Sequence, residues 1–137
     1  MTDYKFSISS LARLDTCDER LKTLAHEALA TSPVDFGIAC GHRDQIAQEE
    51  AFEQKKTKVH FPDSKHNAKP SRAFDFYPVI NGVARWDNAQ AFKDVAHHIL
   101  MTADKIGIAL RWGGTWSDDT EDQLAKFCDM PHIELKG

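Results

Sequence analysis

Two of the seven histidines in this sequence stand near carboxylates with which they could hold a metal ion. His66 precedes a predicted strand in which Asp75 is the only charged residue, and burying a lone aspartate is costly unless it is paired or bound to a metal. His132 follows Asp129 by three residues, with Pro131 restricting the backbone between them. Two imidazoles and one carboxylate suit tetrahedral zinc, and three protein ligands leave the fourth position for water.

Such a site would support hydrolysis. Zinc held by His66, Asp75 and His132 would lower the pKa of a water molecule towards neutrality and polarise a carbonyl group. Asp129, which is close to this set but not needed as a ligand, could then act as the general base. The spacing alone is a weak signal, because the chain contains neither an HExxH motif nor a CxxC pair. The remaining histidines are expected to pack or to face solvent: His26, His42, His60, His97 and His98.

Three helices are predicted from apolar residues at helical spacing. They cover Asp18–Ala30, Asp44–Gln54 and Asn88–Lys105, and Gly107 ends the last of them. The residues of the middle helix expected to point inward are Ile46, Ala47, Ala51 and Phe52. The polar segment Lys55–Ser71 has no hydrophobic period and is predicted to be a long loop, of the kind that often carries function.

Short apolar or alternating runs predict strands over Phe36–Cys40, Ala73–Tyr77, Ile108–Trp112 and His132–Leu135. Pro78 is expected to end the second strand, and Asn81-Gly82 predicts a tight turn between Val79-Ile80 and Val83-Ala84. The elements do not alternate as regular βαβ units. This pattern favours an α+β domain with a largely antiparallel sheet.

The composition is that of one globular domain, expected to span residues 1–137, with 42% hydrophobic and 28% charged residues. The net charge of -4 disfavours nucleic-acid binding. Met1–Ser10 lacks the apolar stretch of a secretory signal, and no apolar run reaches bilayer length, so we expect neither export by a signal peptide nor stable membrane insertion. The cysteines are expected to be reduced thiols: Cys17, Cys40 and Cys128. The acidic stretch Asp118–Asp122 is expected to be a solvated loop rather than a cation site.

Four motifs in order resemble those of the D-Ala-D-Ala carboxypeptidase-like zinc peptidases. Ser64-Lys65-His66 and Ala73-Phe74-Asp75 resemble the Ser-x-His and Ala-x-Asp signature of that family, and Asp129-Met130-Pro131-His132 resembles its acid-x-x-His motif. Gly41-His42-Arg43 and the segment Arg111–Trp116 complete the likeness, which runs from about Ser9 to Leu135. The sequence departs from the common pattern in placing Asp75 nine rather than seven residues after His66. At this last motif the sequence has Asp129-Met130-Pro131 rather than the pattern of the carboxypeptidases. This difference favours the branch of phage endolysins that act as L-alanyl-D-glutamate peptidases.

The resemblance implies a hedgehog/DD-peptidase-like fold and zinc bound by His66, Asp75 and His132, with Asp129 activating water. It places Arg43 at the mouth of the site, where a guanidinium could stabilise an oxyanion or hold a substrate carboxylate, unless it forms a structural salt bridge. Further expected roles are open between two alternatives. Ser64 could orient the substrate or the His66 loop, and Gln48 could contact substrate or face solvent. Trp112 and Trp116 could wall the cleft or belong to the core.

The resemblance further implies a monomeric zinc peptidase that cuts the peptidoglycan stem peptide between L-Ala and D-Glu during host cell lysis. It would wait in the host cytoplasm until release and then act in the periplasm or cell wall, with no separate wall-binding domain. The alternatives are a D-Ala-D-Ala carboxypeptidase or dipeptidase, and a catalytically inactive module that binds wall peptide.

Overall fold

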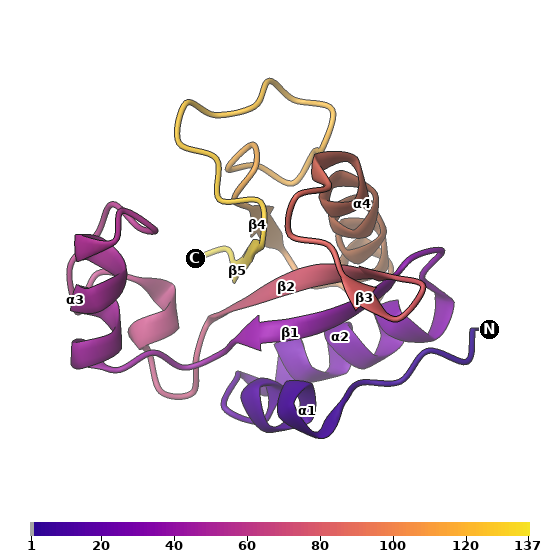
Figure 1. Ribbon diagram of the computed structural model, residues 1–137, viewed down its shortest axis with the longest axis horizontal. Coiled ribbons are helices and arrows are strands. Elements are labelled where there is room, and N and C mark those ends of the chain that lie inside the picture. The colour runs from indigo at the N-terminus through magenta and orange to yellow at the C-terminus, as the bar shows by residue number, and fades with distance from the viewer. Residues whose placement is uncertain (1) are drawn as a thin grey trace.

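The computed structural model describes residues 2–137, and its helices and strands are mixed along the chain (Figure 1). The α-helices are α1 (Ile8–Leu14), α2 (Glu19–Thr31), α3 (Gln45–Glu53) and α4 (Ala89–Ile106), and η1 (Lys65–Asn67) is a short 3-10 helix. The strands are β1 (Asp35–Cys40), β2 (Ala73–Ile80), β3 (Val83–Ala84), β4 (Leu110–Trp112) and β5 (His132–Leu135). The predicted α+β class is confirmed.

The sheet is antiparallel and has the strand order β1-β2-β5-β4, with β3 paired to β2. The C-terminal strand β5 is thus inserted between β2 and β4. This insertion sets Asp75 of β2 directly opposite His132 of β5. On its other side, Asp75 pairs with Cys40 across an irregularity in the register of β1. The topology therefore brings together residues that are far apart in the sequence.

The predicted helices are confirmed, and polar side chains cap each of them. Asp18 accepts a hydrogen bond from the backbone N–H of Arg20, and Asp44 and Asn88 cap the N-termini of α3 and α4 in the same way. Gly107 ends α4 with a φ of 80°, a conformation in which glycine is not strained. Helix α1 was not predicted, because this helix of seven residues buries only Ser10 and Leu14 and so shows little hydrophobic period.

The buried hydrophobic residues form one cluster to which the sheet and the helices α2 and α4 contribute. These two helices pack against each other, and α4 also contacts β2 and β4. Figure 1 shows α3 apart from them at the left-hand end of the sheet, while the segment after β4 arches above β4 and β5 at the top of the view. One core thus supports a sheet whose central strands, β2 and β5, carry two of the three candidate metal ligands, Asp75 and His132.

Three local predictions were wrong. Strand β2 does not end at Pro78 but continues to Ile80. On one side of β2, Pro78 lies between the residues that pair with β5 and those that pair with β3. No neighbouring strand on that side therefore needs the N–H that proline lacks. Ile46 and Ala47 of α3 are exposed, since this short helix packs only through the face that bears Gln48 and Ala51. β4 begins at Leu110 rather than Ile108, since only Leu110–Trp112 pairs with β5. The hairpin at Asn81-Gly82 is confirmed, and both residues have positive φ.

Within residues 2–137, none of the helices combines the length and the apolar character that crossing a bilayer requires.

Candidate metal centre

His66, Asp75 and His132 come together at the edge shared by η1, β2 and β5. One ligand atom from each of them lies within 4.8 Å of the other two. The Nε2 atom of His66 is 3.1 Å from Oδ1 of Asp75, and Nδ1 of His132 is 3.4 Å from the same oxygen. Both imidazoles are buried, with 2% and 5% of their residue surface exposed. The predicted cluster is therefore present, and its donor set is consistent with a bound metal ion.

In each imidazole, the ring nitrogen that points away from the cluster has a hydrogen-bond partner, which leaves the nitrogen that faces the cluster free to bind a metal. Nδ1 of His66 lies 2.8 Å from the carbonyl oxygen of Gly41, and Nε2 of His132 lies 2.8 Å from Oε1 of Glu134. Each of these nitrogens can donate its proton to that oxygen, which leaves the lone pair on the other nitrogen. In the described part of the chain, Nδ1 of His132 is buried and has no hydrogen-bond partner. An orphaned acceptor beside a carboxylate and a second imidazole fits a metal site.

His66 and Asp75 shift each other's pKa values. Burial alone would lower the pKa of His66, but the adjacent Asp75 carboxylate outweighs it and raises this pKa to about 10. Burial would raise the pKa of Asp75, but the two imidazoles hold it well below its ordinary value. In the metal-free protein these opposite pKa shifts favour a proton on His66 beside the ionised Asp75 carboxylate. A metal ion would replace that proton.

Asp129 lies beside this set, as predicted for a general base. One of its carboxylate oxygens is 3.9 Å from Nδ1 of His132, and its side chain lines the pocket in front of the cluster. Burial and the negative charge of Asp75 raise the pKa of Asp129 to about 6. Its backbone is fixed by Gly113, which accepts a hydrogen bond from the N–H of Asp129 and donates one to the carbonyl of His132.

Arg43 lines the same pocket. It also forms a salt bridge, which was the structural alternative to a role in binding substrate or oxyanion, because its Nη2 is 3.5 Å from Oδ2 of Asp75. Its Nη1 donates to Oε1 of Gln48 at 3.0 Å. Gln48 is fully buried, so the expectation that it faces solvent was wrong. Its amide also donates to the carbonyl of Val59 and accepts from Asn67. Gln48 therefore fixes Arg43 and two loops, and its contact with substrate stays a prediction.

Ser64 caps the short helix that carries His66. Its hydroxyl accepts a hydrogen bond from the backbone N–H of His66, and its own N–H donates to the side chain of Asn67. This supports the role of orienting the His66 loop. Ser64 also lines the pocket, so the role of orienting substrate stays a prediction.

The pocket has a volume of about 390 Å³ and is lined in part by residues that were not predicted as site residues. Glu134 is one of them, and it could have been found because His132 and Glu134 are two apart on one strand and so share a face. Its carboxylate also lies 3.3 Å from Nζ of Lys65. Trp116 lines the pocket and places its ring 5.3 Å from that of His132, whereas Trp112 is fully buried in the core.

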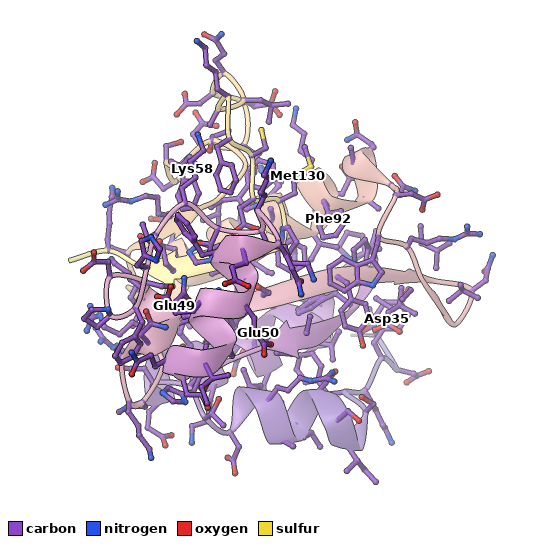
Figure 2. All side chains as sticks on the ribbon, turned by 60° about the vertical axis from the view of Figure 1, so that its left-hand side comes forward. Asp35, Glu49, Glu50, Lys58, Phe92 and Met130 are labelled. Carbon is purple, nitrogen blue, oxygen red and sulfur yellow. The ribbon has the colours of Figure 1, made fainter. Side chains whose placement is uncertain are left out.

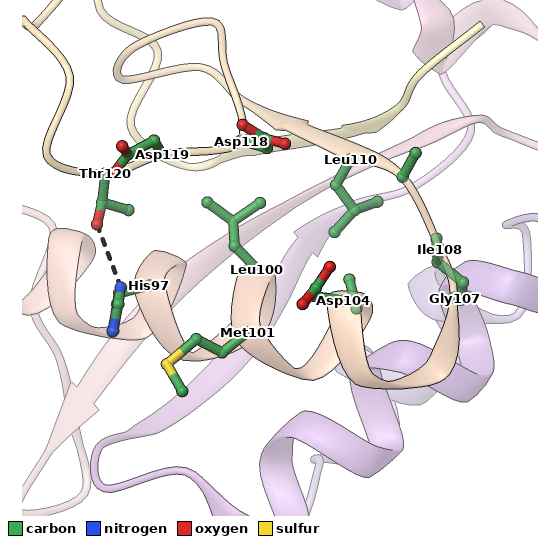
Figure 3. Close-up of a pocket in the computed structure, with 12 residues that line it drawn as sticks. His97, Leu100, Met101, Asp104, Gly107, Ile108, Leu110, Asp118, Asp119 and Thr120 are labelled. Carbon is green, nitrogen blue, oxygen red and sulfur yellow. Dashed lines mark hydrogen bonds between the residues drawn. The ribbon is translucent and has the colours of Figure 1, made fainter.

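The acidic stretch lies elsewhere, beside a second cavity of about 430 Å³ between α4 and the loop of Asp118, Asp119 and Thr120 (Figure 3). Thr120 is 3.4 Å from Nδ1 of His97 there. Within residues 2–137, only His66, Asp75 and His132 form a group of three close enough to hold a metal. The other five histidines are therefore outside the cluster, as expected.

Two buried histidines and a partly exposed aspartate, with a further carboxylate in the adjoining pocket, are consistent with the metal centre of a mononuclear hydrolase. A sequence profile described as phage L-alanyl-D-glutamate peptidase matches residues 2–136. A relative of that name from Escherichia phage T5 is 33% identical over 135 residues, which cover 96% of this chain and 98% of the relative. The chain belongs to the phage L-alanyl-D-glutamate peptidase family, which confirms the resemblance and the peptidase class.

A solved structure supports the fold independently. The crystal structure of Serratia marcescens L-Ala D-Glu endopeptidase ChiX is similar with a TM-score of 0.79 and 23% identity, over 98% of this chain and 92% of that chain.

Proposed function

We propose that this protein is a zinc peptidase that hydrolyses the bond between L-Ala and D-Glu in the stem peptide of bacterial peptidoglycan. The observation that carries the proposal is the set of His66, Asp75 and His132, in which both histidines are buried, with Asp129 beside it. The choice of bond comes from the family and from the phage relative. Zinc is the ion that two imidazoles and one carboxylate suit best. All residues of the centre come from this one chain, so we further propose a single catalytic domain that acts as a monomer.

When bound, zinc supplies Lewis acidity, which polarises the scissile carbonyl and lowers the pKa of a water molecule. Asp129 accepts the proton of the attacking water and then delivers it to the leaving amine of D-Glu. Its position in the pocket beside the cluster suits this role, because a carboxylate within reach of the attacking water can accept a proton and pass it to an amine. Arg43, held by Gln48, presents its remaining N–H groups to the developing oxyanion.

The biological setting of the proposal is host cell lysis. As a member of a phage family, the enzyme would accumulate in the host cytoplasm and reach the cell wall on release. There it would act on the stem peptide in the periplasm or wall.

Replacement of the proposed base tests the catalytic assignment. Asp129→Ala should reduce hydrolysis of purified peptidoglycan by at least about a hundredfold, while zinc content stays near one ion per chain. Asp63→Ala is the matched control, because Asp63 also lines the pocket but is no part of the cluster. Unchanged hydrolysis by Asp129→Ala would refute the role of Asp129. A wild-type protein that binds zinc and wall peptide but releases no product would instead be an inactive binding module.

A further inference from the structure

Lys58 stands at the junction of two hollows on the surface. It lines the metal pocket and also an adjoining cavity of about 620 Å³ whose other lining residues include Phe52 and Phe127. Phe127 likewise lines both hollows. Figure 2 shows Lys58 between α3 and the C-terminal part of the chain that carries Met130. A ligand that extends from the metal pocket into the adjoining cavity would therefore lie beside Lys58.

The three cations that line the metal pocket differ in what already binds them. Arg43 faces Asp75 and Gln48. Lys65 contacts the Glu134 carboxylate and the carbonyl of Leu135. Lys58 has no ion pair or hydrogen bond with any residue between 2 and 137. Among these three cations, Lys58 is therefore the one whose charge no carboxylate of residues 2–137 neutralises through an ion pair.

The position of the Lys58 ammonium is nevertheless restrained. Its Nζ lies 5.2 Å from the centre of the Phe127 ring, within the range of a cation–π interaction. The backbone of the next residue, Val59, is anchored because its carbonyl accepts a hydrogen bond of 2.8 Å from the buried Gln48. The indole of Trp116 in turn donates to the carbonyl of Phe127 at 2.9 Å. The backbone next to Lys58 and the backbone of Phe127 are thus both hydrogen-bonded to side chains near the metal site, those of Gln48 and Trp116.

The substrate offers a matching anion, if the proposed function is correct. D-Glu in the stem peptide is linked onward through its γ-carboxyl group, so its α-carboxylate is free. That carboxylate is attached to the same carbon as the scissile nitrogen. We propose that Lys58, restrained over Phe127, binds the α-carboxylate of the D-glutamyl residue and selects stem peptides that carry it. A charge-assisted hydrogen bond between ammonium and carboxylate is stronger than one to a neutral amide.

The test compares two synthetic stem peptides that differ only at this group, one with the α-carboxylate and one with the α-carboxamide. The wild-type zinc enzyme should cleave the carboxylate peptide with a kcat/KM about ten- to a hundredfold higher. Lys58→Met should bring the ratio of the two kcat/KM values close to one, mainly by raising KM for the carboxylate peptide. Lys58→Arg should keep most of the preference. Lys56→Met is the matched control, because Lys56 is an exposed neighbour that lines neither hollow.

Two results would overturn the inference: a wild-type enzyme that cleaves both peptides equally well, or a Lys58→Met variant that keeps the full preference for the carboxylate. Failure of the proposed function would look different. In that case the wild-type enzyme would cleave neither peptide between L-Ala and D-Glu, whatever residue stands at position 58.

Discussion

Glu134 decides which nitrogen of His132 faces the cluster, because its carboxylate is 2.8 Å from Nε2 and leaves Nδ1 towards Asp75. We predict that Glu134→Ala weakens zinc binding by about ten- to a hundredfold. Glu134→Gln should cost less, since an amide oxygen can still accept the Nε2 proton. The measurement is zinc affinity by competition with a chelator, and Glu27→Ala on the exposed face of α2 is the control. An unchanged affinity for Glu134→Ala would show that Glu134 does not position the ligand.

His66 gives a prediction on pH. Its pKa in the zinc-free protein is raised to about 10, above the ordinary value of 6.5, so the folded state binds this proton more tightly than the unfolded chain. The resulting stabilisation is fully present below pH 6.5 and is lost as the pH rises through about 10. A ¹⁵N titration of the zinc-free protein should therefore show His66 protonated above pH 8. In Asp75→Asn the pKa of His66 should fall well below its wild-type value of about 10, because the largest influence that raises it is removed; persistence of the high pKa there would contradict Asp75 as its cause.

At the scale of elements, the turn between β4 and the C-terminal segment positions both Asp129 and His132. A side chain at Gly113 would meet the carbonyl of Asp129 and the Cβ of His132. We predict that Gly113→Ala shifts this segment, destabilises the fold by about 1–3 kcal/mol and weakens zinc binding. Denaturant unfolding and a zinc titration measure the two effects.

Gly107→Ala is the matched control for Gly113→Ala. Gly107 has a φ of 80° with nothing within 4 Å of an added Cβ, so this variant should lose about 1 kcal/mol through backbone strain and keep its zinc affinity. If Gly113→Ala also kept its zinc affinity, the turn would not be needed to hold the centre.

The elements that the sequence could predict are those with a strong local signal. The long helix α4 has an apolar stripe, a capping asparagine and a terminal glycine, and the hairpin at Asn81-Gly82 has its own turn signature. Helix α3 shows the limit of such signals. Its exposed Ile46 and buried Gln48 reverse the hydrophobic pattern, because Gln48 is held by hydrogen bonds to Arg43 and Val59 that only the folded chain provides.

The candidate site, like the fold, could be predicted from the sequence only in part. The residue types and motifs were sufficient to pick out His66, Asp75 and His132, but the pairing of β2 with β5 that joins them is a long-range contact with no local signal. Lys58 and Phe127 are distant in sequence and belong to no motif, so the contact between them could be found only from the three-dimensional structure.

For the whole molecule, the metal centre joins η1, β2 and β5, so a bound ion should stabilise the entire domain. An ion that binds only the folded state, at a free concentration about 1,000 times its Kd, adds about 4 kcal/mol to the free energy of unfolding. For a chain of this length that corresponds to a rise in Tm of roughly 10 °C. Thermal unfolding with zinc and with a chelator measures the difference.

The matched variants for this measurement are His132→Ala and Asp129→Ala. His132→Ala should lose the rise in Tm, because it removes a ligand, whereas Asp129→Ala should keep it. Equal Tm values for wild-type protein with and without zinc would mean that the three residues do not form the metal site.

The central claim concerns the bond that the whole molecule cuts, and mass spectrometry of digested peptidoglycan tests it most directly. Purified peptidoglycan treated with the zinc-loaded protein should yield fragments with a new N-terminal D-Glu and glycan strands that keep L-Ala. The zinc-free protein should yield neither product. Release of D-Ala alone, with the L-Ala–D-Glu bond intact, would contradict the account and identify a carboxypeptidase instead.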